Sequence, residues 1–179
     1  RLFFTPEDSE CARVLHQCGY THCKVSHANS QNADLLKYVG RTFLRSFISI
    51  DPIKVVPDMS AIRLGSGQDA TALMLTRGLY PPALSDLHLE NLDKYSCTGY
   101  SSHYPDWSLP FLVAVNFRLK VVEVHVANKQ SSGLDPDRPV SLSEEDLLSL
   151  TGALDRTQPL LSFLPGRYNA SDSFSPKIA

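Results

Sequence analysis

The chain has 179 residues, of which 42% are hydrophobic and 20% are charged. This length and composition are typical of one globular domain and exclude wholesale disorder. No apolar run approaches the roughly 18 residues that a membrane span requires, so the sequence excludes an integral membrane protein. The formal net charge of −2 disfavours a generally basic, nonspecific nucleic-acid binder and leaves a local basic face open.

The first 50 residues predict two helices. The segment Thr5-Pro-Glu-Asp8 marks the start of a helix over 6–18, which Gly19 ends in a left-handed conformation. A broad apolar stripe of period 3.6 predicts a second helix over 32–50, running through the core and terminated by Asp51-Pro52.

The rest of the chain gives weaker signals. Segment 110–127 is ambiguous, because its valines favour strand while it offers no clear hairpin turn. The other predicted elements are helices over 70–79 and between Pro82 and Tyr95, a loop over 96–109, and a last helix beginning after Ser141 or Ser143.

The cysteines are predicted to be reduced thiols in an intracellular compartment, because a chain of this size needs no disulfides. They are Cys11, Cys18, Cys23 and Cys97. Two of them share a short segment with three histidines: His16, Cys18, His22, Cys23 and His27. A zinc site is one interpretation, although the spacings miss the usual ligand pairs; a buried thiol pair with incidental histidines is the other.

A glycine-containing loop offers a nucleotide-binding interpretation. Segment 64–69 (Leu-Gly-Ser-Gly-Gln-Asp) is similar to the pyrophosphate loop of ATP-dependent amide-forming and tRNA-modifying enzymes, which cradles phosphate at a helix start. Such a loop should follow a buried strand, and 57–63 is a poor strand. A capped helix after a turn is the alternative.

Basic side chains recur along the predicted helix over 32–50. Lys37, Arg41 and Arg45 are spaced by four residues, so that they would line one face of that helix. This stripe is interpreted either as a solvated face or as a surface that contacts RNA phosphates.

Stretches towards both ends of the chain resemble the signature motifs of the ribonuclease III family. Thr5-Pro-Glu7, Tyr20-Thr-His-Cys-Lys-Val-Ser26 and Ala33-Asp-Leu-Leu-Lys-Tyr-Val-Gly-Arg41 resemble the start of that domain. Glu145-Asp-Leu-Leu-Ser-Leu-Thr-Gly-Ala-Leu154 resembles its second motif, and 108–119 is similar to the helix before it. The resemblance implies an all-α fold in which 110–118 is helical.

The resemblance also implies that catalysis has been lost. The family holds divalent metal with four acidic side chains. The matching positions here are Lys37, Arg41, Glu145 and Leu148, so only Glu145 could still bind metal. The chain is therefore predicted to be no enzyme, with no catalytic residue, no metal and no cofactor.

Degenerate domains of this family occur in the mitochondrial large ribosomal subunit, notably as a fungal heterodimer. The resemblance implies a non-catalytic ribosomal protein of the mitochondrial matrix. Its implied partners are other large-subunit proteins, including a second ribonuclease III-like protein, and rRNA contacted by Lys37, Arg41 and Arg45. Val39, Phe43 and Phe47 are predicted interface or core residues.

The predicted domain spans 1–165, with an insertion over 80–107 and a polar tail over 166–179. Two other functions are weighed against the ribosomal one. The first is an ATP-dependent ligase or tRNA-modifying enzyme that uses the loop at 64–69. The second is a pseudonuclease subunit of an RNA-processing complex, which would share the fold and differ in its partner.

Overall fold

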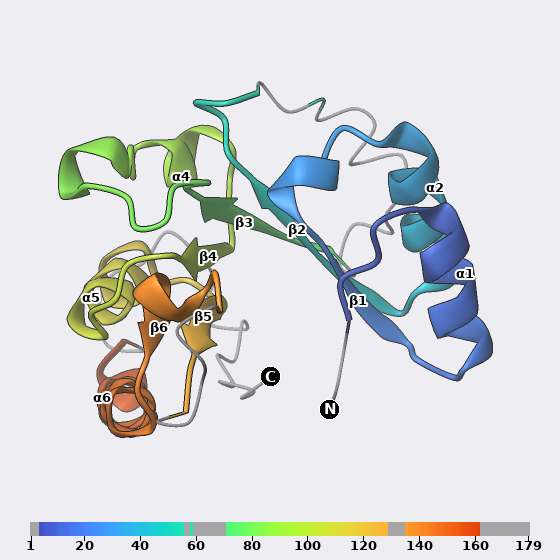
Figure 1. Cartoon of the computed structure of the whole chain (residues 1–179). Coiled ribbons are helices and arrows are strands. Elements are labelled where there is room, and N and C mark those ends of the chain that lie inside the picture. The colour runs from blue at the N-terminus through green and yellow to red at the C-terminus, as the bar shows by residue number, and fades with distance from the viewer. Residues whose placement is uncertain (1–3, 56–57, 59–70, 129–134, 162–179) are drawn as a thin grey trace. The chain divides into compact units, whose positions relative to one another are not determined.

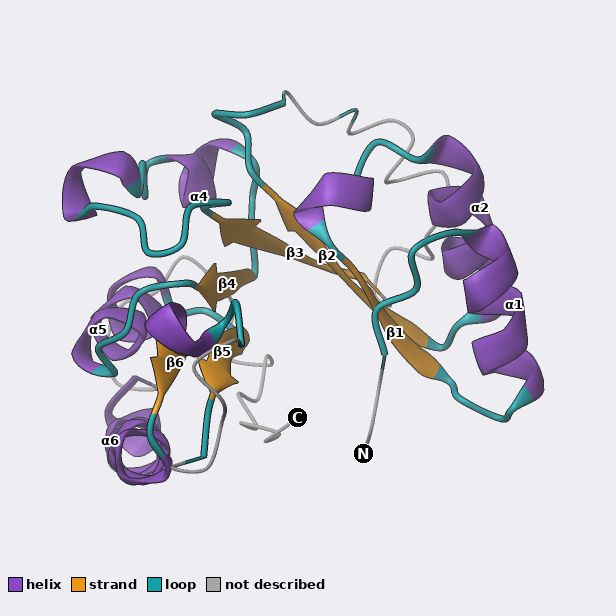
Figure 2. Ribbon diagram, viewed as in Figure 1, coloured by secondary structure: helices purple, strands orange, loops and turns teal. Residues whose placement is uncertain are grey.

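A computed structural model of the chain describes residues 4–55, 58, 71–128 and 135–161 (Figure 1). Within these residues the chain is an α/β protein with six strands and helices between most of them (Figure 2). The prediction of an all-α, ribonuclease III-like fold is therefore wrong. It failed because buried parallel strands are short apolar runs, which periodicity does not distinguish from buried helices.

The chain divides into two compact units. Unit 1 contains the described residues up to Gly78 together with Leu89–Cys97, and unit 2 contains Leu79–His88 and the described residues from Thr98 onward. The predicted domain limits and the insertion over 80–107 stay predictions. The polar tail over 166–179 lies outside the described residues.

Unit 1 is built on three parallel strands. β1 (His22–Val25) pairs with β2 (Arg45–Ile50), and β2 pairs with β3 (Thr71–Thr76). Helices α1 (Ser9–Gln17) and α2 (Ala33–Thr42) lie on the same side of these strands (Figure 1). α2 packs against β2, and α1 packs against α2.

The first predicted helix is confirmed with a different cap. Asp8 rather than Thr5 begins α1, since its Oδ1 accepts the backbone N–H of Cys11 at 2.7 Å. Gly19 follows the helix with φ +87°, the left-handed conformation that the sequence predicted.

The predicted helix over 32–50 is only half correct. Asn32 caps α2 by accepting the Leu35 N–H, but the helix ends at Thr42 and Phe43 is extended. The apolar residues from Phe47 onward form β2 instead, every residue of which from Ser46 to Ile50 is buried. A strand buried on both faces produces the continuous apolar run that was interpreted as a helical stripe.

Unit 2 repeats the strand–helix pattern. β4 (Gly99–Ser102) pairs in parallel with β5 (Val121–Val126), which pairs in parallel with β6 (Ser141–Leu142). α5 (Ser108–Phe117) packs against β4, β5 and α6 (Glu144–Leu161), and α6 also packs against β6. The ambiguous segment 110–127 is therefore a helix followed by a strand.

Other predictions for the second half had mixed outcomes. The last helix is confirmed, with Ser143 Oγ accepting the N–H of Asp146 at 3.1 Å. The predicted helix over 70–79 is wrong, because β3 occupies it, and the predicted loop over 96–109 contains β4. The predicted helix between Pro82 and Tyr95 is reduced to short pieces. The short helical elements of the two units are η1 (His27–Asn29), η2 (Leu84–Asp86), α4 (Asn91–Lys94) and η3 (Arg138–Val140).

In the ranges that the structure describes, no helix is both long and apolar enough to cross a bilayer.

Candidate functional site

Polar side chains gather at the carboxyl ends of the strands in both units. In unit 1, His27 lies two residues after β1, and Asp51 and Arg77 directly follow β2 and β3. In unit 2, His103 directly follows β4 and His125 is the penultimate residue of β5. Proteins built of parallel strands and covering helices bind their ligands at these ends, because the connecting loops and strand ends converge there. Each unit therefore presents a candidate site.

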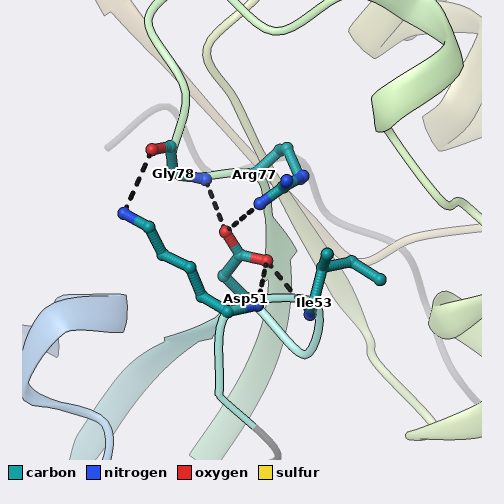
Figure 3. Close-up of polar contacts among 5 residues, drawn as sticks. Asp51, Ile53, Arg77 and Gly78 are labelled. Carbon is teal, nitrogen blue, oxygen red and sulfur yellow. Dashed lines mark hydrogen bonds and ion pairs between the residues drawn. The ribbon is translucent and has the colours of Figure 1, made fainter.

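Asp51 joins the ends of β2 and β3 in unit 1 (Figure 3). Its Oδ2 accepts the Gly78 N–H at 2.8 Å and pairs with Arg77 Nη1 at 2.6 Å. Its Oδ1 accepts the N–H groups of Ile53 at 3.2 Å and Lys54 at 3.4 Å. With a side chain only 1% exposed, Asp51 is a buried anion surrounded by donors from two loops.

The Asp51 carboxylate is ionised at neutral pH despite its burial. Burial by itself would raise its pKa, but the hydrogen bond from Gly78 N–H and the hydrogen bond and charge of Arg77 act in the opposite direction. The net effect holds the pKa of Asp51 below its ordinary value of 3.8. The negative charge of Asp51 therefore balances the positive charge of Arg77.

The imidazole of His27 lies against the backbone of Gly78. A Cβ at Gly78 would stand 2.5 Å from His27 Nε2, so only glycine allows this approach. Lys54 Nζ donates to the Gly78 carbonyl at 3.3 Å. Burial and the nearby charge of Lys54 lower the pKa of His27, which is therefore neutral at pH 7 and able to accept or donate one hydrogen bond.

The lowered pKa of His27 predicts acid sensitivity. The His27 imidazole binds a proton more tightly in the unfolded chain than in the folded chain. The contribution of neutral His27 to the free energy of unfolding is therefore fully present above the ordinary pKa of 6.5 and is lost as pH falls through the folded-state pKa. When pH is lowered from about 7.5 to about 5.5, the urea concentration at the unfolding midpoint should therefore fall more for the wild type than for His27→Gln. His16 is exposed, so His16→Gln should show the same change in midpoint with pH as the wild type. An equal change in all three proteins would contradict the prediction.

One face of the unit 1 sheet carries polar side chains towards the same strand ends. Side chains alternate along each strand, and the register places Lys24, Ser49 and Thr76 on one face with Asp51. The opposite face is mostly apolar, which suits packing against α2. Ser49 is buried, and its Oγ has no hydrogen-bond partner within the described part of the chain. This hydroxyl is available to a polar ligand atom.

Three aromatic rings form a cluster in unit 2, named the ring cluster: Tyr80, His103 and His125. Tyr80 stacks on His103 with ring centroids 4.3 Å apart, and its hydroxyl lies 3.3 Å from His103 Nε2. His125 completes the cluster, 5.1 Å from the His103 ring and 6.0 Å from the Tyr80 ring. Asp137 Oδ2 lies 3.4 Å from His125 Nδ1.

The ring cluster combines groups that can exchange protons with a ligand. Burial, assisted by the charges of Asp137 and Glu123, raises the pKa of Tyr80, so its phenol stays protonated at neutral pH. Imidazoles transfer protons near neutral pH and also bind metals. Among the described residues, however, no group of three or more His, Cys, Asp and Glu side chains is placed to hold a metal ion. The phenol and the imidazoles can form hydrogen bonds with a ligand and exchange protons with it.

The residues that the sequence proposed for a site lie elsewhere. Lys37 and Arg41 are exposed on α2, whereas Arg45 lies in β2 with its guanidinium 5.4 Å from the centre of the Phe47 ring. The three therefore do not line one helix, because α2 ends before Arg45. Glu145 and Leu148 are exposed on α6. RNA contact by the basic side chains stays an untested prediction.

The proposed interface residues are buried within unit 1. Val39 is 1%, Phe43 6% and Phe47 8% exposed. These side chains belong to the core, and a role in a protein interface stays a prediction. The predicted pyrophosphate loop over 64–69 lies outside the described residues.

The cysteine–histidine segment is dispersed by the fold. Cys23 is buried in β1 and Cys18 is exposed at the end of α1, while His27 lies near Asp51. Burial raises the pKa of both Cys23 and Cys97 to about 12. Sequence alone did not indicate which thiols are buried.

This burial predicts two classes of thiol. In the native protein, Cys11 and Cys18 should react with iodoacetamide, and Cys23 and Cys97 should react more than about a thousandfold more slowly, since the thiolate is the nucleophile. Mass spectrometry of native and urea-unfolded samples measures both classes. Rapid native labelling of Cys23 or Cys97 would contradict the prediction.

Sequence reasoning named His27, as a possible zinc ligand, and missed the other members of the two strand-end groups. A signal was present in the segments Gly99–Ser102 and Val121–Val126, where short strand-forming runs end at or near a histidine. A polar residue that closes a short apolar run is typical of a parallel strand with a functional end.

These features define an α/β protein with ligand-binding chemistry at the ends of parallel strands. The sequence matches the model of the NeuB family over residues 1–162, and the chain belongs to that family. No curated protein matches the sequence at a significant level.

Solved structures agree with this assignment in fold. The chain is similar to N-acetylneuraminic acid (sialic acid) synthetase from Leptospira borgpetersenii in complex with citrate, with a TM-score of 0.75, 19% identity and coverage of 92% of this chain and 59% of that one. The chain is also similar to spore coat polysaccharide biosynthesis protein spsE from Bacillus subtilis. The TM-score is 0.70 at 19% identity, with coverage of 98% of this chain and 52% of that one.

A truncated 3-deoxy-D-arabino-heptulosonate 7-phosphate synthase from Thermotoga maritima gives a TM-score of 0.68 at 12% identity, covering 89% of this chain and 66% of that one. The chain thus spans about half the length of the first two solved proteins and about two thirds of the third.

These comparisons overturn the predicted identity. The chain is a NeuB family member and not a ribonuclease III-like domain, so the ribosomal role, the ribosomal partners and the heterodimer with a second such protein are wrong. The prediction that the chain is no enzyme is contradicted as well, because it followed from the ribonuclease III resemblance, and solved proteins of similar fold are named as a synthetase and a synthase. The mitochondrial location followed from the resemblance and stays an untested prediction.

Proposed function

We propose that this chain forms the substrate-binding part of a synthase in carbohydrate biosynthesis. The observation that carries the proposal is the ring cluster of Tyr80, His103 and His125 at the ends of β4 and β5 in a NeuB family chain. A sugar-derived substrate offers hydroxyl and carbonyl oxygens, which the phenol and the imidazoles can bind by hydrogen bonds and supply with protons.

The relatives support the substrate class. One is named for synthesis of sialic acid and was solved with citrate, and another for polysaccharide biosynthesis. We infer that the substrate carries hydroxyl groups and a carboxylate.

The test is direct binding of N-acetylneuraminic acid and, separately, citrate to the full chain by isothermal titration calorimetry. Tyr80→Phe and His125→Gln each remove one polar atom or ring from the cluster while keeping most of the side-chain volume. Both should weaken binding by about tenfold, since a lost hydrogen bond to a ligand is worth about 1 kcal/mol or more.

His16→Gln is the matched control, because His16 is an exposed histidine on α1, outside both strand-end groups. It should bind both ligands as the wild type does. The proposal fails if the wild type binds neither ligand, or if Tyr80→Phe and His125→Gln both bind with unchanged affinity.

A further inference from the structure

The donors around Asp51 are arranged as a receptor for one carboxylate group (Figure 3). Its Oδ2 accepts the Gly78 N–H at 2.8 Å and pairs with Arg77 Nη1 at 2.6 Å. Its Oδ1 accepts the N–H groups of Ile53 at 3.2 Å and, more weakly, Lys54 at 3.4 Å. Backbone N–H groups and a guanidinium are the donors with which proteins bind the carboxylate and phosphate groups of ligands. These four donors are named the Asp51 cradle.

The Asp51 cradle lies where a ligand would be expected. Its donors come from the two segments that directly follow β2 and β3, and the carboxyl ends of parallel strands are the usual place for ligands. The Asp51 side chain is 1% exposed and that of Arg77 is 14% exposed, so water competes little for the donors. The occupant of this place is nevertheless a side chain of the protein itself.

The backbone holds the first of these segments independently of the Asp51 side chain. The N–H groups of Lys54 and Val55 both donate to the Asp51 carbonyl at 3.0 Å. These main-chain hydrogen bonds do not involve the carboxylate, so they can persist when the side chain is replaced. The Gly78 N–H and the Arg77 guanidinium come from the other segment, which follows a strand paired with β2. The cradle should therefore keep its donors in place without Asp51.

We propose that the Asp51 cradle is an anion-binding site that the chain fills with its own carboxylate, so that Asp51 excludes the carboxylate and phosphate groups of ligands from the ends of β2 and β3. A second anion would meet a buried like charge and find the donors already occupied. Removal of the Asp51 side chain should open the site to a small carboxylate. This inference does not depend on the proposed function, which rests on the ring cluster of unit 2.

Formate and the variant Asp51→Gly test the proposal. Glycine removes Cβ as well as the carboxylate, which leaves room for a formate carbon that is not bonded to the chain. Thermal unfolding of the full chain is followed by far-UV circular dichroism at about pH 7, in about 100 mM sodium formate or sodium chloride. With a Kd of about 10 mM, formate should raise the Tm of Asp51→Gly by about 3–6 °C relative to chloride. The wild type should have the same Tm in both salts.

Three control variants assign the effect to the Asp51 cradle. Asp51→Asn removes the charge but keeps the space filled, so formate should not change its Tm relative to chloride. Asp34→Gly makes the same substitution at an exposed carboxylate on α2 and should not respond either. Asp51→Gly/Arg77→Met lacks the charged donor and should lose most of the formate response.

Asp51→Ala is a second variant, which avoids the added backbone freedom of glycine. If either variant is unfolded in chloride, the expected result is that formate restores its folded spectrum. The proposal is overturned if formate and chloride act equally on both variants, or if neither variant folds in either salt. It is also overturned if formate raises the Tm of the wild type as much as that of Asp51→Gly, or if the full response remains in Asp51→Gly/Arg77→Met. None of these results depends on whether the chain binds N-acetylneuraminic acid.

Discussion

Asp51→Ala is expected to lower the free energy of unfolding by about 3–5 kcal/mol, the usual cost of removing one partner of a buried ion pair. The variant leaves Arg77, which is 14% exposed, without its carboxylate and deprives the Gly78 N–H of its acceptor. Urea unfolding followed by far-UV circular dichroism measures the change. The effect should be larger than for any other single carboxylate discussed above, because Asp51 connects the loops after two neighbouring strands.

Two further variants decide the cause of this loss. Asp34→Ala removes an exposed carboxylate from the first turn of α2 and should cost no more than about 1 kcal/mol. The double variant Asp51→Leu/Arg77→Met removes both charges and should recover only part of the stability, because the N–H groups of Gly78, Ile53 and Lys54 still lose their acceptor. Similar losses in Asp51→Ala and Asp34→Ala would show that the buried pair does not stabilise unit 1.

Gly78→Ala is expected to destabilise the protein by about 1–3 kcal/mol, the range for overpacking. The new methyl group would stand 2.5 Å from His27 Nε2 and 3.2 Å from Lys54 Nζ. Gly78 does not have the positive φ that alanine avoids, so the cost arises from the contact and not from the backbone. Removing the imidazole in Gly78→Ala/His27→Ala should therefore cost less than the two single changes added together, which a double-mutant cycle measures.

Gly152→Ala is the matched control for this substitution. Its added methyl group meets the guanidinium of Arg156, with Nη1 at 3.3 Å and Cζ at 4.0 Å, and the end of an arginine side chain can move aside. Because alanine favours helix more than glycine does, this variant of α6 should be neutral or more stable. Strict additivity in the Gly78–His27 cycle would contradict the close approach of the imidazole to the glycine.

The candidate sites illustrate why local sequence signals were insufficient. Asp51 and Arg77 are 26 residues apart, and neither lies in a recognised motif. Their pairing depends on β2 and β3 being adjacent and parallel, which places both strand ends at one edge. The ring cluster depends in the same way on the β4–β5 register, together with a tyrosine from the segment after β3.

What the sequence by itself determined are the features that depend on neighbours within one or two turns. The start of α6 at Ser143, the left-handed Gly19 and the cap of α2 follow from side chains that hydrogen-bond to nearby backbone or from the conformational freedom of glycine.

Only the tertiary structure decided which apolar runs are strands. Residues 45–50 and 71–76 satisfy a helical pattern as well as a strand pattern, and pairing with neighbouring strands selects the latter because it satisfies their backbone groups while burying both faces. The same pairing brings Asp51 to Arg77 and His103 to His125, and with them the chemistry of the strand ends.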